Sequence, residues 1–138
     1  MSDRIFVDTN VFIYADDGAR PAKQERAREL IRQLIRERSG VVSLQVQQEY
    51  FAAATRKLRM ASGDARSRVE IYAQFEVVRF GPDDLLRAID LHRVYSISIW
   101  DSLIVHAAMI SDCRTLYTED LQDGFRIEKL EFVNPFAR

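Results

Sequence analysis

Short runs of apolar residues alternate along the chain with longer segments in which apolar residues recur every three or four positions. The short runs predict buried strands, because each is brief and most are rich in Val, Ile, Leu or Phe. They lie at Ile5–Val7, Val41–Val42, Val77–Phe80, Thr115–Tyr117 and Leu130–Val133. Strands that alternate with helices in this way are typical of a parallel sheet covered on both faces.

The longer segments predict helices between these strands. A proline or a serine cap marks the start of several helices, and a break is expected at Ser62-Gly63-Asp64. The predicted helical segments are a short turn at Phe12–Tyr14 and longer helices over Pro21 to about Arg38, Ser43 to about Met60, roughly 65–75, Gly81 to about Tyr95, and Ser98 to about Asp112.

This alternation predicts an α/β fold of three layers, α/β/α, around a central parallel sheet of about five short strands in the order 3-2-1-4-5. A chain of 138 residues with 47% hydrophobic content is sufficient for one compact core, so we expect a single domain over residues 1–138. In such sheets ligands bind beyond the carboxyl ends of the strands, where the winding reverses.

Cysteine content and hydropathy narrow the class of protein. Cys113 is the only cysteine, which excludes a disulfide within the chain and a zinc site of the Cys/His kind. No run approaches the roughly 18 apolar residues that a membrane span needs. The first strand follows closely on Met1 without a signal peptide, so a cytoplasmic protein is expected.

Charge is divided unevenly along the chain, although the net charge is only −1. Residues 20–68 carry twelve Arg or Lys against five acids, a net of +7, whereas residues 81–131 carry five against ten, a net of −5. Such runs are usually solvated helix faces. They also suit a basic rim beside an acidic pocket, the arrangement that a metal-dependent enzyme acting on a polyanion requires.

Four acids are the candidate metal ligands, because each follows or flanks an apolar element and the predicted sheet would make them neighbours. They are Asp8, Glu49, Asp101 and Asp120. Single carboxylates are costly to bury, whereas several around one point are tolerable when a divalent cation lies between them. Asp8, in the triplet Asp8-Thr9-Asn10 behind the first strand, is the least ambiguous. Its alternative role is to cap the next turn.

Glu49 and Asp101 also have ordinary structural explanations. Glu49 lies about 60° from Val46 on the helical wheel, so it could simply reach solvent. It borders the stripe that is expected to be buried, which comprises Val46, Tyr50, Ala53 and Ala54. Asp101 stands three positions after Ser98, as in a capping box, although it shares an apolar helix face on which a carboxylate needs a partner.

Asp120 belongs to an acid-rich turn after the fourth predicted strand, a kind of sequence that is common before a glycine. Glu119 and Asp123 could bind a metal in its place, and the sequence does not choose between the three. Trp100 and Tyr14 are expected in the core or in a dimer contact, rather than as platforms on which bases stack.

Four stretches of the chain resemble the motifs of PIN-domain ribonucleases, specifically the VapC toxins of toxin–antitoxin modules. They are Phe6-Val7-Asp8-Thr9-Asn10, Ser43 through Gln48-Glu49, Trp100-Asp101-Ser102-Leu103-Ile104, and Leu116-Tyr117-Thr118-Glu119-Asp120-Leu121. Each motif is short, but their order and spacing cover nearly the whole chain.

The resemblance implies a PIN-like fold and a Mg²⁺- or Mn²⁺-dependent endoribonuclease that cuts single-stranded or looped RNA. It carries the catalytic and metal-ligand roles onto Asp8, Glu49, Asp101 and Asp120. The residues expected to support them are Thr9, Asn10, Thr118 and Glu119. The resemblance also implies a homodimer and a small antitoxin whose tail blocks the active site.

In the expected mechanism, a cation lowers the pKa of a bound water, and it or a second cation neutralises charge on the scissile phosphate. Asp8 is the expected principal ligand. Glu49 binds the metal directly or through water, or orients the attacking water. Repulsion between the carboxylates in the metal-free pocket is expected to raise at least one pKa.

Two other functions stay open at the level of sequence. Asp8 could be the covalent nucleophile of a phosphotransferase, as in phosphatases with an Asp-x-Asp motif, but position 10 is Asn and no clear lysine follows at a late strand end. The chain could instead be a catalytically inactive PIN-like domain that only binds a partner, although it retains all four acids.

Overall fold

The structure, a computed structural model, describes residues 3–137, so residues 1, 2 and 138 of the predicted domain lie outside the described part. It contains a six-stranded sheet in the order β3-β2-β1-β4-β6-β5. The strands are β1 (Ile5–Val7), β2 (Gly40–Ser43), β3 (Glu76–Val78), β4 (Thr115–Tyr117), β5 (Arg126–Ile127) and β6 (Leu130–Val133). Neighbouring strands are parallel except β5 and β6, which are antiparallel.

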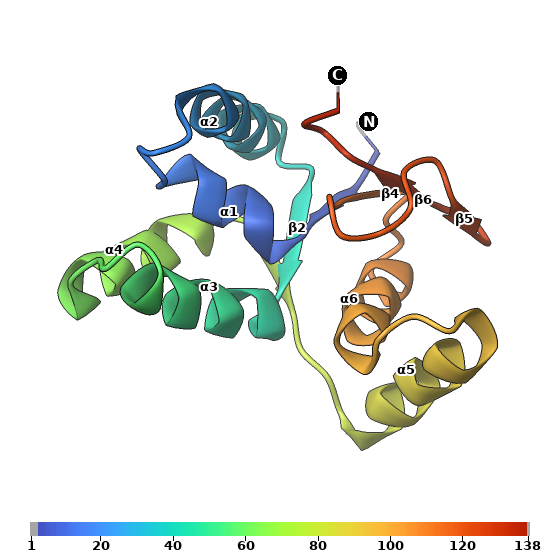
Figure 1. Ribbon diagram of the computed structural model, residues 1–138. Helices are drawn as coiled ribbons and strands as arrows, with labels where there is room; N and C mark the ends of the chain where they lie inside the picture. Colours follow the sequence, from blue (N-terminus) through green and yellow to red (C-terminus); the bar gives the residue numbers. More distant parts are fainter. Residues whose placement is uncertain (1–2, 138) are drawn as a thin grey trace.

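Helices cover both faces of this sheet, which confirms the predicted three-layer α/β/α arrangement. The helices within residues 3–137 are α1 (Thr9–Ala15), α2 (Pro21–Glu37), α3 (Leu44–Arg56), α4 (Ser62–Tyr72), α5 (Pro82–Tyr95) and α6 (Ile99–Ile110). Figure 1 shows α1 to α4 on one side of the sheet and α5 and α6 on the other. None of the helices in this part of the chain is long and apolar enough to cross a membrane.

The predicted strand order is confirmed for the five predicted strands, the last of which is β6, but the sheet has a sixth strand that was not predicted. This strand, β5, forms a hairpin with β6 in which Ile127 pairs with Leu130. The loop is therefore only Glu128-Lys129, and Glu128 has a positive φ of 53°. Hairpin loops of this length favour Asn or Gly, so Glu-Lys carries no recognisable turn signal.

The predicted boundaries of α3 and α4 were wrong by several residues. Helix α3 ends at Arg56 rather than near Met60, and Arg59 just beyond it has a positive φ of 56°. Helix α4 begins at Ser62, so residues 62–64 form its first turn and not a break. A glycine costs little so close to a helix end, and Asp64 in the first turn is stabilised by the positive end of the helix dipole.

Strand β3 and helix α1 also differ from the prediction. Strand β3 ends at Val78, two residues early, because Val78 pairs with Ser43, where β2 ends and α3 begins. The expected short turn after β1 is a complete helix, α1, that starts immediately behind the strand. This abrupt change from strand to helix places residues 8–10 at the carboxyl edge of the sheet.

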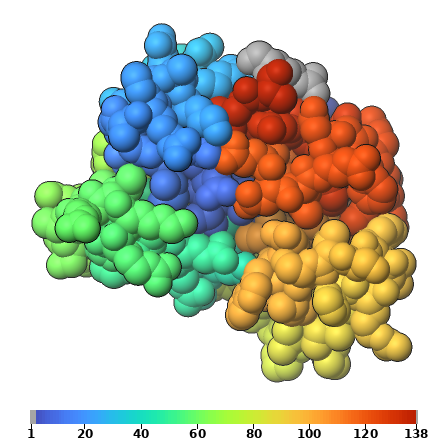
Figure 2. Space-filling view, viewed as in Figure 1, coloured from blue at the N-terminus to red at the C-terminus, as the bar shows by residue number. Residues whose placement is uncertain are grey.

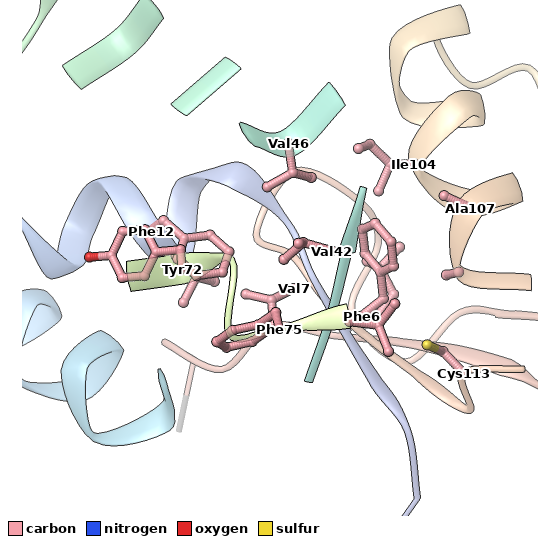
Figure 3. Packing of buried hydrophobic residues seen from close by; sticks show 14 of the residues in the cluster. Phe6, Val7, Phe12, Val42, Val46, Tyr72, Phe75, Ile104, Ala107 and Cys113 are labelled. Atoms are coloured by element: carbon pink, nitrogen blue, oxygen red, sulfur yellow. The ribbon is translucent and has the colours of Figure 1, made fainter. Parts of the chain in front are cut away.

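A buried hydrophobic core holds the central strand against both helix layers (Figure 3). Phe6 and Val7 of β1 are fully buried. On one face, the ring of Phe12 packs 4.6 Å from that of Tyr72, measured between ring centroids. On the other face, Ile104 of α6 is buried. The residue that follows β1 is therefore anchored by well-packed neighbours.

Candidate active site

Asp8 follows the central strand and is held by three hydrogen bonds. Its backbone N–H donates to the carbonyl of Tyr117 (3.0 Å), which continues the pairing of β1 with β4. Its Oδ1 accepts from the Thr9 N–H (2.7 Å) and caps α1, and its Oδ2 accepts from the Thr118 hydroxyl (2.9 Å). Asp8 is only 6% exposed. Asp8 therefore caps α1, the alternative role that the sequence left open, and this role does not prevent it from also being a site residue.

Burial raises the pKa of the Asp8 carboxyl from 3.8 to about 7. The hydrogen bonds from Thr9 and Thr118 lower this pKa, whereas the negative charges of Asp120 and Glu49 raise it further. A raised pKa in this pocket was expected from repulsion between carboxylates. Repulsion does contribute, but loss of hydration is the larger cause.

Glu49 reaches the same place from α3 and does not simply extend into solvent. Its Oε1 accepts from the Thr9 hydroxyl (2.7 Å), and its Oε2 accepts from the side-chain amide of Gln45 (3.2 Å). Thr9 thus connects both carboxylates, since its N–H binds Asp8 and its hydroxyl binds Glu49. These contacts set the direction in which the Glu49 carboxylate points.

Asp120 lies in the turn after β4 and is held from two sides. Its Oδ2 accepts from the side-chain amide of Asn10 (2.9 Å), and its backbone N–H donates to the Thr118 hydroxyl oxygen (3.2 Å). Partial burial raises the pKa of Asp120, and the charge of Asp101 is the next largest cause. The supporting positions Asn10 and Thr118 therefore do contact the acids.

Asp101 enters from the first turn of α6, on the opposite side of the sheet from α3. Its backbone N–H donates to the hydroxyl of Ser98 (3.0 Å), which caps the helix as expected. Partial burial raises the pKa of its carboxyl, the side chain of Ser98 lowers this pKa, and the charge of Glu49 raises it. The adjacent Trp100 is 64% exposed, so it does not lie in the core of this chain, and the expected alternative, a dimer contact, stays a prediction.

The four acids line one open cleft of about 320 Å³ at the carboxyl edge of the sheet. In Figure 2 the blue segment near residue 10, the green segment of α3 and the orange segments of residues 100–120 border one another on one face. They meet because β1 and β4 are neighbours from which the chain winds in opposite directions.

Of the three acids in the turn after β4, only Asp120 lines this cleft. Glu119 accepts a hydrogen bond from the Tyr14 hydroxyl and pairs with Lys23 (3.1 Å). Asp123 accepts from the backbone N–H of Asn134 (2.9 Å). Glu119 and Asp123 are thus engaged elsewhere, a distinction that the sequence of the turn does not reveal.

The chemistry of the cleft suits a hard divalent cation. The negatively charged groups that could bind an ion are the four carboxylates, and no His or Cys is among the residues that line the cleft. In residues 3–137, no group of three or more His, Cys, Asp or Glu side chains is arranged to hold an ion with the side chains as they stand. Mg²⁺ keeps several water ligands, so a few carboxylates are enough. Glu49 and Asp101 are partly exposed and Asp120 is exposed, so these three side chains have room to adjust.

Thr118→Val is expected to raise the pKa of Asp8 above its value of about 7. The valine keeps the shape of the side chain but removes a hydrogen bond that favours the charged carboxylate. A hydrogen bond to a charged group contributes roughly 1.5–3 kcal/mol, which corresponds to a shift of about 1 to 2 pH units. A carbon NMR titration of selectively labelled aspartate measures the shift. Thr118→Ser, which keeps the hydroxyl, should titrate like the wild type, and an unchanged pKa in Thr118→Val would contradict the assignment.

The sequence matches the PIN domain family over residues 5–126. The chain therefore belongs to this family, which confirms the resemblance of its four motifs. A comparison with curated proteins gives no match.

Three solved structures of toxin–antitoxin proteins share this fold. A toxin–antitoxin complex from Klebsiella pneumoniae has a TM-score of 0.69 at 19% identity, over 95% of this chain and 97% of that one. VapBC2 from Rickettsia felis, bound to a DNA fragment from their promoter, has a TM-score of 0.68 at 18% identity, over 93% and 96%. VapC20 from Mycobacterium tuberculosis, a Sarcin-Ricin loop cleaving toxin, has a TM-score of 0.66 at 18% identity, over 84% and 89%. At identities this low, the three comparisons establish a shared fold alone.

Proposed function

We propose that this chain is a divalent-metal-dependent endoribonuclease and the toxin of a VapBC-type toxin–antitoxin module. The observation that carries the proposal is the convergence of Asp8, Glu49, Asp101 and Asp120 on one cleft from four separate parts of the chain. Membership of the PIN domain family supports it. So does the likeness of the fold to VapC and VapBC structures.

Asp8, Glu49, Asp101 and Asp120 would hold Mg²⁺ or Mn²⁺, which in such sites activates water and neutralises charge on the scissile phosphate. Asp8 is the rigid member of the set, because both of its carboxylate oxygens and its backbone N–H are hydrogen-bonded. Thr9 and Gln45 hold Glu49 so that it can accept a hydrogen bond from the attacking water. Hydrolysis joins the water oxygen to phosphorus, breaks one P–O ester bond and leaves a proton on the departing oxygen.

We also propose a small antitoxin as partner, since two of the structures with this fold are of a toxin–antitoxin complex and of VapBC2. We propose a homodimer, as the family resemblance implies, and a cytoplasmic location. RNA is the proposed substrate, and the basic segment of residues 20–68 would favour its approach.

Removal of divalent metal is expected to abolish RNA cleavage by the purified chain. The experiment incubates end-labelled cellular RNA with the protein and Mg²⁺ or Mn²⁺, and then repeats the reaction in EDTA and after the metal is restored. The double variant Asp101→Asn with Asp120→Asn, purified in the same way, controls for contaminating ribonuclease. Cleavage that persists in EDTA, equal cleavage by the double variant, or no cleavage with either metal would contradict the proposal.

A further inference from the structure

One face of α3 presents an acid, two alanines and a cation to the cleft. Glu49, Ala52, Ala53 and Arg56 are spaced at i, i+3, i+4 and i+7, so they share one side of the helix. All four line the cleft that holds the acids. Ala53 was expected in the buried stripe of α3, but it is only partly buried, and Ala52 is exposed. This face is therefore open to a ligand along its length.

The cations at the end of this face are not neutralised by neighbours. Arg56 is the last residue of α3 and Lys57 is its cap, and both line the cleft with exposed side chains. Among residues 3–137, no ion pair joins either of them to a carboxylate. Lys23, by contrast, is paired with Glu119. Arg56 and Lys57 are thus available to an anion that enters the cleft.

The spacing separates this anion from the carboxylates. Seven residues of α-helix between Glu49 and Arg56 correspond to roughly 10 Å along the helix axis. Ala52 and Ala53 lie in that interval and have no side-chain atoms beyond Cβ, so they leave room for a chain to pass. A polyanion laid along α3 would therefore place one phosphate near the acids and another near Arg56.

We propose that Arg56, with Lys57 beside it, is a positioning residue that binds an RNA phosphate next to the scissile one, and that Ala52 and Ala53 form the floor over which the RNA backbone passes. This inference rests on the proposed ribonuclease function. The four acids alone would repel RNA, so a cation in the same cleft offsets that repulsion for one neighbouring phosphate. The basic rim suggested by the charge distribution lies, at least in part, at this end of the cleft.

The test measures how RNA binding depends on salt. Fluorescence anisotropy of a labelled single-stranded RNA of about 12 nucleotides and mixed sequence is followed with Asp8→Asn protein, which is expected not to cut it, from about 50 to about 300 mM NaCl. Adding Arg56→Gln should weaken binding several-fold and reduce the slope of log K against log salt by about 0.7, the contribution of one phosphate contact in single strands. Ala52→Leu should weaken binding without lowering the melting temperature.

Arg36→Gln is the matched control, because Arg36 is an exposed arginine near the end of α2, which leads into the amino end of β2 at the opposite edge of the sheet. An unchanged slope in Arg56→Gln, or an equal loss in Arg36→Gln, overturns the inference. In otherwise wild-type protein, Arg56→Gln should raise KM more than it lowers kcat. If Arg56→Gln changes the slope as predicted but the wild-type protein cuts no RNA, the nuclease proposal alone is refuted.

Discussion

Asp8→Asn is expected to lower metal-dependent RNA cleavage at least about 100-fold while leaving the fold intact, because loss of even an indirect support of a metal site costs about 10- to 100-fold. Asparagine keeps the shape of the side chain, and its carbonyl can still accept from the Thr9 N–H. Its amide group would then face the Thr118 hydroxyl oxygen, which can accept instead of donate. The charge that binds a cation is the main property that changes. Initial rates at saturating Mn²⁺, with circular dichroism spectra of both proteins, measure the effect.

Asp90→Asn is the control for this experiment. Asp90 is an exposed acid on α5 that does not line the cleft, so the same chemical change there should leave the rate unaltered. Full activity in Asp8→Asn would remove Asp8 from the metal site. A loss of activity that is matched by Asp90→Asn would show an effect of net charge alone.

The same Asp8→Asn substitution should stabilise the metal-free protein at about pH 8, by on the order of 2–4 kcal/mol. Asp8 titrates near pH 7 when folded and near its ordinary value of 3.8 when unfolded. Between these two values the folded chain binds a proton that the unfolded chain has released. The free energy of unfolding of the wild type therefore falls as pH rises from about 4 to about 7 and stays low above that. Asparagine does not titrate, so the variant lacks this loss.

Urea denaturation in EDTA at about pH 4 and about pH 8 measures the difference. The two proteins should have similar stabilities at the lower pH, and the variant should be the more stable at the higher pH. Adding Mn²⁺ at the higher pH should stabilise the wild type and not the variant, because a ligand that binds only the folded state stabilises it. An Asp8→Asn protein that is no more stable than the wild type at the higher pH would show that burial of the Asp8 charge has little cost.

Together these two results would show that the buried charge of Asp8 lowers the stability of the metal-free protein and is needed for RNA cleavage. A carboxylate that is 6% exposed and next to other acids is unfavourable for the folded state unless a cation compensates for it. Residues that reduce stability but improve activity when a ligand is bound are typical of functional sites.

The sequence by itself determined the features that depend on neighbouring residues. Strands β1 and β4 were predicted correctly, because each is a short apolar run with polar residues on both sides. The caps Ser43 and Ser98 were also correct, since a capping hydrogen bond joins residues only three positions apart. The four acids could be proposed because each follows, or lies within, a predicted strand or helix.

The tertiary structure decided which groups contact one another across the chain. Asp120 rather than Glu119 faces the cleft because Glu119 binds Tyr14, 105 positions away in sequence. The hydroxyl of Thr118 meets Asp8 across 110 positions because β1 and β4 pair in register. Ala53 lines the cleft and is only partly buried, although its position on the helical wheel predicted a place in the core. Apolar periodicity predicts that a residue lies on one face of its element, but only the packing of elements determines what that face meets.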